Sequence, residues 1–214
     1  FRSGDSPVFH LQTPPHMASG ARANQLALLD ELNRHHADRF PGNTELTARI
    51  ANFETAARMQ SAVPEAMDLS RETAATRRLY GLDNPVTAEY GRRCLIARRL
   101  VERGVRFVQL FLSGQPWDTH DKNAERLRGL CARTDQPSAA LVRDLQSRGL
   151  LDSTVVLWTG EFGRLPISQG KDGRDHNRHA FSLWAAGGGF KAGYVHGATD
   201  DFGYKAIQDV VSVH

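Results

Sequence analysis

Carboxylate and imidazole side chains gather in three short polar segments of this chain. The first segment holds Asp118 and His120, the second holds Glu161, and the third holds His176 and His179. Imidazole nitrogens and carboxylate oxygens are ligands that zinc, manganese and other divalent ions take in proteins. We therefore interpret these five residues as candidate metal ligands. The two cysteines lack metal-type spacing, which argues against a structural zinc knot.

Arginine dominates the basic residues, because only four of the 27 are lysine. A guanidinium group binds phosphate or sulfate oxygens through two parallel hydrogen bonds. Most of these arginines are scattered among Asp and Glu, which favours solvated helix faces. Arg164 and Arg174 lie beside the candidate ligands, and we expect them to bind an anionic oxygen. No basic stripe is interleaved with aromatic residues, so nucleic acid is not an expected partner.

Structural roles compete with the metal interpretation at each segment. Asp118 or Asp121 can cap the helix that follows the first segment. Glu161 and Arg164 can form an exposed ion pair in a turn, worth less than about 1 kcal/mol. Of the two late histidines, one is expected to contact a ligand and the other to face solvent, with a slight preference for His176.

The elements that must position these residues change character near Gly104. From residue 20 to residue 104 the pattern is helical, with Asn43 or Thr44 as the expected N-cap of one helix. A second helix is expected after Asn84-Pro85, and Gly104 is its expected left-handed stop. The apolar stripes that predict these two helices are Leu46, Ile50, Phe53 and Ala57, and then Tyr90, Cys94, Ala97 and Val101.

Three apolar runs after Gly104 predict buried strands, at 105–112, 154–159 and 181–186. A helix is expected over 123–148, restarted by Pro137. Strand, helix and strand in this order predict a parallel pair with a right-handed crossover. Ligands of open α/β sheets bind beyond the carboxyl ends of the strands, so the first two polar segments should meet at one sheet edge. We therefore predict an α/β fold preceded by helices.

Composition is that of an ordinary globular chain. Its 214 residues are 40% hydrophobic and 24% charged, with a formal net charge of +3. No run of eighteen apolar residues occurs, so no transmembrane helix is expected. The chain begins at Phe1 rather than at a methionine, and we expect it to be a fragment.

The motifs of this chain resemble those of a known bacterial family. The segments that carry the resemblance are LVERGVRFVQLF, WDTH, DLQSRGLLDSTVVLWTGEFGR, GRDHNRHAFSLWAAGGG and GATDDFGYKAI. They are similar to the sulfatase-like family known as domain of unknown function 1501, common in planctomycetes and assigned to the alkaline phosphatase superfamily. The resemblance covers essentially the whole chain.

This resemblance implies one alkaline-phosphatase-like domain over 1–214, with a mixed, largely parallel sheet sandwiched by helices. Its mainly helical part is 20–104 and its α/β core part is 105–214. The family pattern implies that the first strand and the C-terminal end lie outside this chain. It also implies export or a periplasmic location.

The resemblance also assigns roles to particular residues. Asp118 and His120 stand where an Asp and a His metal ligand are expected. Glu161 matches the first residue of an Asp-His pair, and His176 or His179 matches the late His ligand. Three departures remain: Phe162 replaces the second residue of that pair, the Asp118-to-His120 spacing is short, and the segment that carries the nucleophile is absent.

The expected function is metal-dependent hydrolysis of a phosphate or sulfate ester, of a small molecule or a saccharide. The expected cofactor is a divalent ion, zinc first, with manganese or calcium as alternatives. The rival is a non-catalytic relative whose metal site has degenerated and whose surface binds polysaccharide or a partner protein, and Phe162 favours it. A module that stores or senses zinc is a third reading.

Overall fold

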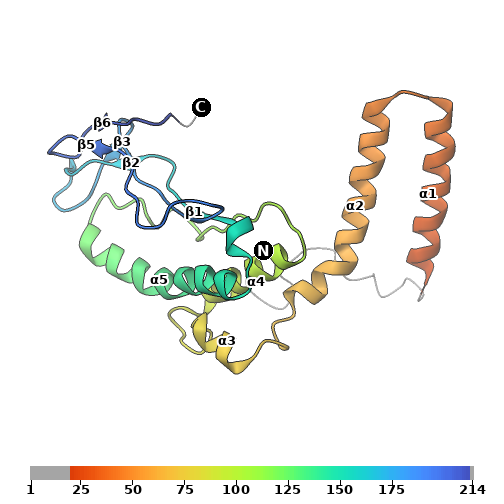
Figure 1. Ribbon diagram of the computed structural model, residues 1–214, viewed down its shortest axis with the longest axis horizontal. Coiled ribbons are helices and arrows are strands. Elements are labelled where there is room, and N and C mark those ends of the chain that lie inside the picture. The colour runs from red at the N-terminus through yellow and green to blue at the C-terminus, as the bar shows by residue number, and fades with distance from the viewer. Residues whose placement is uncertain (1–19, 213–214) are drawn as a thin grey trace. The chain divides into compact units, whose positions relative to one another are not determined.

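The chain divides into two compact units, residues 1–71 and residues 72–214. The computed structural model describes residues 20–212, without the side chains of 59–62. Figure 1 shows helices as the dominant elements of both units. The change in sequence character at Gly104 falls inside the second unit.

The described part of the first unit, residues 20–71, contains two helices, α1 (Ala21–Arg39) and α2 (Thr44–Met67). Asn43 caps α2, because its side-chain oxygen accepts the Leu46 N–H at 3.0 Å. This confirms the predicted start of that helix. Helix α1 has no buried residue, and the side chains of Leu28 and Leu32 are more than half exposed.

The core of the second unit lies between helices α4 (Ala88–Glu102) and α5 (Asn123–Ser147), with the short α3 (Ala74–Leu79) beside α5. Its largest fully buried side chains are Tyr80, Leu95, Leu145, Thr119, Thr134, Pro137 and Cys94. Burial of apolar side chains is the main favourable contribution to such a helix pair.

Glycine ends both core helices in the same way. Gly104 has φ +80°, and the next N–H, that of Val105, bonds the carbonyl of Leu100 at 3.1 Å. Gly149 has φ +68°, and the Leu150 N–H bonds the carbonyl of Leu145 at 2.9 Å. Both are Schellman motifs, which need a residue in the left-handed region. The predicted stop at Gly104 is confirmed.

A buried charge network crosses the α4–α5 core. The Arg98 side chain is 2% exposed, and its Nη2 lies 2.8 Å from Oε1 of Glu72. Its Nε lies 3.0 Å from Oδ2 of Asp144, and the Tyr80 hydroxyl donates to that oxygen at 3.0 Å. Glu102 meets Arg98 Nη1 at 2.5 Å. Burial, reinforced by the Asp144 charge, raises the pKa of Tyr80 far above its usual value.

The strands in residues 72–212 are short and form three two-stranded antiparallel pairs. The pairs join β1 with β4, β2 with β3, and β5 with β6. A 3₁₀ turn at Leu151–Ser153 leads into the first strand. The strands are β1 (Val155–Trp158), β2 (Gly163–Arg164), β3 (His176–Asn177), β4 (Trp184–Gly187), β5 (Ala198–Thr199) and β6 (Ala206–Gln208).

The expected parallel sheet, sandwiched by helices in an alkaline-phosphatase-like fold, is wrong. Strand β1 is confirmed within the predicted 154–159, but it pairs antiparallel with β4, with Trp158 opposite Trp184. The segment 105–112 forms no strand in the described part of the chain. Its sequence favours extended backbone, but a strand also needs a neighbour, and β1 does not lie in register beside it.

Smaller expectations about element boundaries also fail. Helix α5 continues through Pro137 instead of restarting there, and that proline ring is fully buried. Helix α4 begins at Ala88, because Asn84 instead accepts the Val86 N–H within the preceding turn, at 3.0 Å. Strand β4 begins at Trp184 rather than Phe181.

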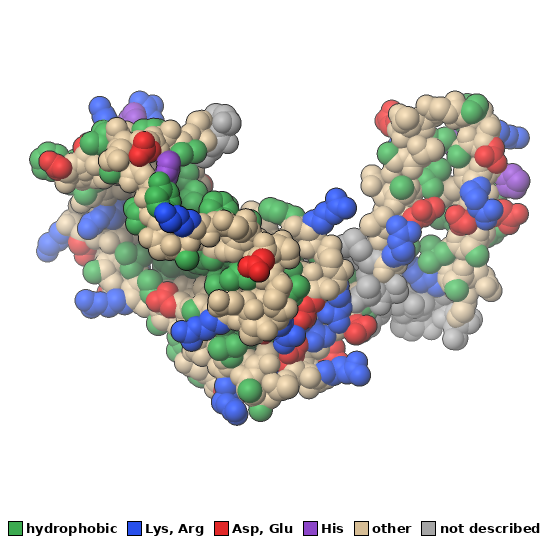
Figure 2. Space-filling view, viewed as in Figure 1, with side chains coloured by type: hydrophobic (Ala, Val, Ile, Leu, Met, Phe, Trp, Pro, Cys, Tyr) green, Lys and Arg blue, Asp and Glu red, His purple; other side chains and the backbone are tan. Residues whose placement is uncertain are grey.

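Apolar side chains lie open to solvent on the second unit. Phe107, Phe111, Leu157 and Leu183 are all more than half exposed. Figure 2 shows hydrophobic side chains on the surface of this unit. None of the helices in residues 20–212 combines the length and apolarity needed to cross a membrane.

Candidate metal centre

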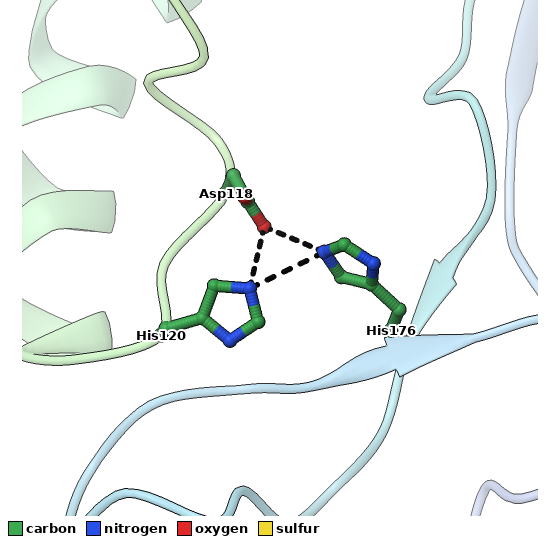
Figure 3. A group of neighbouring side chains, drawn as sticks. All are labelled: Asp118, His120 and His176. Carbon is green, nitrogen blue, oxygen red and sulfur yellow. Dashed lines mark hydrogen bonds and ion pairs between the residues drawn. The ribbon is translucent and has the colours of Figure 1, made fainter.

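Asp118, His120 and His176 point toward one another (Figure 3). Oδ1 of Asp118 lies 3.1 Å from Nε2 of His120 and 2.9 Å from Nε2 of His176. The two Nε2 atoms are 3.3 Å apart. Asp118 is 24% exposed and each histidine about half exposed, so solvent reaches this triad.

The loop before α5 positions the first two residues of the triad. The Asp118 N–H bonds the carbonyl of Gln115 and so closes a turn. Thr119 is fully buried; its Oγ1 donates to Oδ1 of Asn123 at 2.6 Å, and its carbonyl accepts the Arg174 N–H at 2.8 Å. Anchoring of Thr119 fixes the side chains on either side of it.

His176 comes from β3, where it lies opposite Arg164 of β2. The loop before β3 approaches the His120 backbone so closely that only glycine fits at 173. A Cβ on Gly173 would lie 1.9 Å from the carbonyl oxygen of His120. This close backbone approach brings His176 and His120 together across 56 residues of sequence.

The donor atoms of the triad are spaced as the ligands of one metal ion. Zinc–nitrogen and zinc–oxygen bonds of about 2.0–2.2 Å at tetrahedral angles place ligand atoms roughly 3.3 Å apart. The three observed separations run from 2.9 to 3.3 Å. Three protein ligands with an open fourth position are typical of catalytic rather than structural zinc sites.

Asp175 contacts the ring nitrogen of His120 that does not face the other two triad residues. Its Oδ1 lies 3.1 Å from Nδ1 of His120, and its Oδ2 accepts the Gln169 N–H at 2.7 Å. A carboxylate on the far nitrogen orients an imidazole ligand and makes it more basic. The sequence alone did not indicate this role for Asp175, because its only signal there is its place directly before His176.

Arg164 neutralises Asp118. Its Nη1 bonds Oδ1 of Asp118, and its Nη2 meets Oε1 of Glu161 at 2.8 Å. The hydrogen bond from His176, and then Arg164, holds the pKa of the Asp118 carboxyl below its usual value. The predicted Glu161–Arg164 ion pair therefore exists, and it is linked to the triad.

The remaining predicted site residues lie outside the triad. Glu161 is exposed and reaches it only through Arg164. His179 is exposed, and its Nε2 accepts a hydrogen bond from Nε of Arg178 at 3.2 Å. Arg174 donates from its side chain to the carbonyl of Gly173. Neither Asp118 nor Asp121 serves as the cap residue of α5, since the helix begins after Lys122 and that residue makes no side-chain cap bond.

Aromatic residues and a large cavity adjoin the triad. The Phe162 ring centroid lies 4.4 Å from that of His176, and the Arg164 guanidinium lies 5.1 Å from the Phe162 centroid. A cavity of about 1300 Å³ is lined by Asp118, Arg164 and His176 together with the chain's three tryptophans. The triad therefore has space beside it for a ligand much larger than phosphate.

Comparison with known proteins identifies a family without assigning a chemistry. No curated protein is significantly similar to this chain. No solved structure is significantly similar to it either. The family described as "Protein of unknown function (DUF1501)" matches residues 1–214. Since that match spans all the residues given, the chain belongs to the DUF1501 family.

Proposed function

We propose that this chain is a metal-dependent hydrolase of phosphate or sulfate esters. The observation that carries the proposal is the convergence of Asp118, His120 and His176, with three donor atoms at the spacing of one ion's ligands. The resemblance of the surrounding motifs to the alkaline phosphatase superfamily supports this class of ester. Zinc is the proposed ion, with manganese or calcium as alternatives.

The ion would supply one kind of chemistry at this site. A divalent cation polarises a phosphoryl or sulfuryl oxygen and acidifies water in contact with it. Asp118, His120 and His176 would hold the ion, and Asp175 would keep the Nε2 of His120 directed toward it.

Arg164 is the proposed anion-binding group. Oδ1 of Asp118 is both a partner of Arg164 and one of the three donor atoms. When Asp118 binds a cation, the guanidinium loses that partner and keeps Glu161. Arg164 can then turn toward an anionic oxygen of the ester, to which guanidinium groups bind strongly. Arg174, which lines the same cavity, is a second candidate for this role.

Metal analysis and titration test the ligand set. The chain is purified without added metal and without a histidine tag, its metal content is measured, and it is titrated with zinc and manganese. We expect one zinc per chain, with affinity falling at least about 100-fold in Asp118→Asn and in His176→Ala. The matched control is His179→Ala, an exposed histidine three positions away that should leave affinity unchanged.

The same preparations separate hydrolysis from other metal chemistry. The zinc-loaded chain should cleave an aryl phosphate or an aryl sulfate, and Asp118→Asn should abolish cleavage. Two His and one carboxylate are also the ligand set of non-haem iron enzymes. Stoichiometric iron, or an equal loss of zinc in His179→Ala, would contradict the proposal.

A non-catalytic binding protein is the second candidate. Phe162 favours it, because its apolar ring packs on His176 where a further ligand is expected from the family resemblance. This candidate predicts turnover of neither ester and no stoichiometric zinc, because its metal site has degenerated.

A further inference from the structure

The three tryptophans of the chain form one cluster. Trp117 and Trp158 meet edge to face, with ring centroids 5.7 Å apart and an interplanar angle of 82°. Trp158 and Trp184 are paired across β1 and β4, with centroids 6.1 Å apart and rings inclined by 17°. Cross-strand aromatic pairs stabilise small sheets, but that role alone does not require a third ring.

The cluster stands beside the metal centre. Trp117 directly precedes Asp118 in the chain, and all three indoles line the cavity that Asp118, Arg164 and His176 also line. Trp184 is 40% exposed, and the other two rings are half-buried. Indoles that remain open to water beside a polar site offer flat apolar faces to a ligand.

The rest of the lining indicates which kind of ring fits. Most of the lining is apolar, and the exposed amides of Gln109 and Gln115 add hydrogen-bond donors and acceptors. Asn123 also lines the cavity, but its Oδ1 already accepts the Thr119 hydroxyl. A ligand that stacks one apolar face on indole while its edges carry hydroxyl groups would use both features, and a pyranose ring has this form. An aryl group would use only the apolar part of the lining and would leave the exposed amides bonded to water.

The size of the cavity extends the argument from one ring to several. Drug-sized ligands occupy roughly 300–1,000 Å³. The cavity of about 1300 Å³ therefore exceeds the needs of one small ester. We propose that Trp117, Trp158 and Trp184 bind the sugar rings of an oligosaccharide, so that its sulfate or phosphate ester lies at the metal centre. The ester part of this statement rests on the proposed function, whereas the ring-binding part does not.

Tryptophan fluorescence of the whole, metal-free chain tests the ring-binding part. Emission reports on this cluster alone, because the chain has no other tryptophan. The probes are cellotetraose, maltotetraose and a sulfated galactan tetrasaccharide, with phenyl sulfate and adenosine monophosphate as non-sugar rings. We expect a saturable change with at least one tetrasaccharide, at an affinity about tenfold or more above that for either non-sugar ring.

Variants identify the residues responsible. Trp184→Ala should weaken tetrasaccharide binding about tenfold, and Trp184→Phe should restore most of it. Leu183→Ala is the matched control, since that neighbouring side chain is also exposed and does not line the cavity. Thermal melting establishes that each variant is folded. Equal losses in Trp184→Ala and Leu183→Ala would overturn the proposal.

The outcomes also distinguish this inference from the proposed function. Asp118→Asn should lose zinc but keep binding of the neutral tetrasaccharides. If the chain binds no metal and the tetrasaccharides still change the emission, the sugar site stands and the hydrolase proposal falls. If none of the three tetrasaccharides changes the emission, or if phenyl sulfate or the nucleotide binds as tightly, the sugar site is overturned whatever the metal result.

Discussion

Two clusters of charged side chains in residues 72–214 contain similar groups, but one cluster is buried and the other is exposed to solvent. Around Arg98, carboxylates and a phenol are buried between α4 and α5, and Glu72 and Asp144 are each 7% exposed. Around Asp118, the carboxylate and two imidazoles are open to solvent. Buried charges cannot change partners without a large desolvation cost, whereas exposed charges can. The buried cluster is therefore suited to holding the helices, and the open cluster to exchanging ligands.

Removal of the buried cation should have the largest effect on stability. Arg98→Met removes one cation from Glu72 and Asp144 and leaves them with Arg99 and Arg148, respectively. The free energy of unfolding should fall by about 3 kcal/mol, the low end of the range for a broken buried ion pair. Asp118→Asn should change it much less, because that carboxylate is open to solvent. Urea unfolding of both variants measures the difference. Equal losses would show that the two clusters do not differ in this way.

Asp175→Asn should weaken zinc binding without removing a ligand. An amide cannot provide the negative charge that orients His120 and makes it more basic, so zinc affinity should fall about 10–100-fold. Zinc competition against a chromogenic chelator measures it. Asp172→Asn is the control, because that side chain accepts the Lys122 N–H and does not contact the triad histidines. Unchanged zinc affinity in Asp175→Asn would remove Asp175 from the centre.

A buried thiol in the α4–α5 core also predicts a loss of stability at alkaline pH. Burial raises the pKa of the Cys94 thiol to about 12. The unfolded thiol ionises near 8.5, so the unfolded state loses this proton first as the pH rises. The contribution of the Cys94 thiol to the free energy of unfolding is complete below about pH 8.5. It falls by about 1 kcal/mol for each further pH unit up to about pH 12.

Comparison with Cys94→Ala isolates this contribution. The slope of unfolding free energy against pH between 9 and 11, roughly the range in which only the unfolded thiol ionises, should be shallower in the variant. Identical slopes would show that Cys94 is not the responsible group.

The smallest expected effect concerns Arg164. Arg164→Gln removes a cation from Oδ1 of Asp118 and should tighten zinc binding about threefold, because the pair is partly exposed and screened. The same change should raise the KM for an aryl sulfate or phosphate. Arg178→Gln, an exposed arginine beside His179, is the control for net charge. Weaker zinc binding in Arg164→Gln would show that Arg164 supports the triad instead of competing for it.

Local sequence signals predicted the helices well. Asn43 at the start of α2, Gly104 after α4 and the near-exact span of α5 each depend on neighbouring residues. The pairing of strands could not be predicted from such signals, because it depends on which segment returns beside β1. The run at 105–112 was recognised as apolar, but its lack of a neighbour is a property of the tertiary structure.

The candidate site was predicted in part, and for a reason that the structure does not support. Asp118 and His120 were expected to meet Glu161 at a parallel sheet edge, with His176 supplied by the loop that follows. The triad forms instead because the β2–β3 pair and Gly173 carry His176 against the loop before α5. Glu161 and His179 also carry side chains that can bind a metal ion, and they lie near the other candidates in the sequence. In the structure they contact Arg164 and Arg178 and do not join the triad.

The apolar run at 105–112 and strand β1 have a consequence for association between chains. In residues 20–212, β1 pairs only with β4, and Val155 and Leu157 on it are more than half exposed. Unpaired backbone donors and acceptors flanked by apolar side chains are a template for pairing with another chain. At high concentration such edges promote intermolecular sheet formation and aggregation. A charged residue at the exposed Leu157 position is the substitution that should most improve solubility while leaving the α4–α5 core intact.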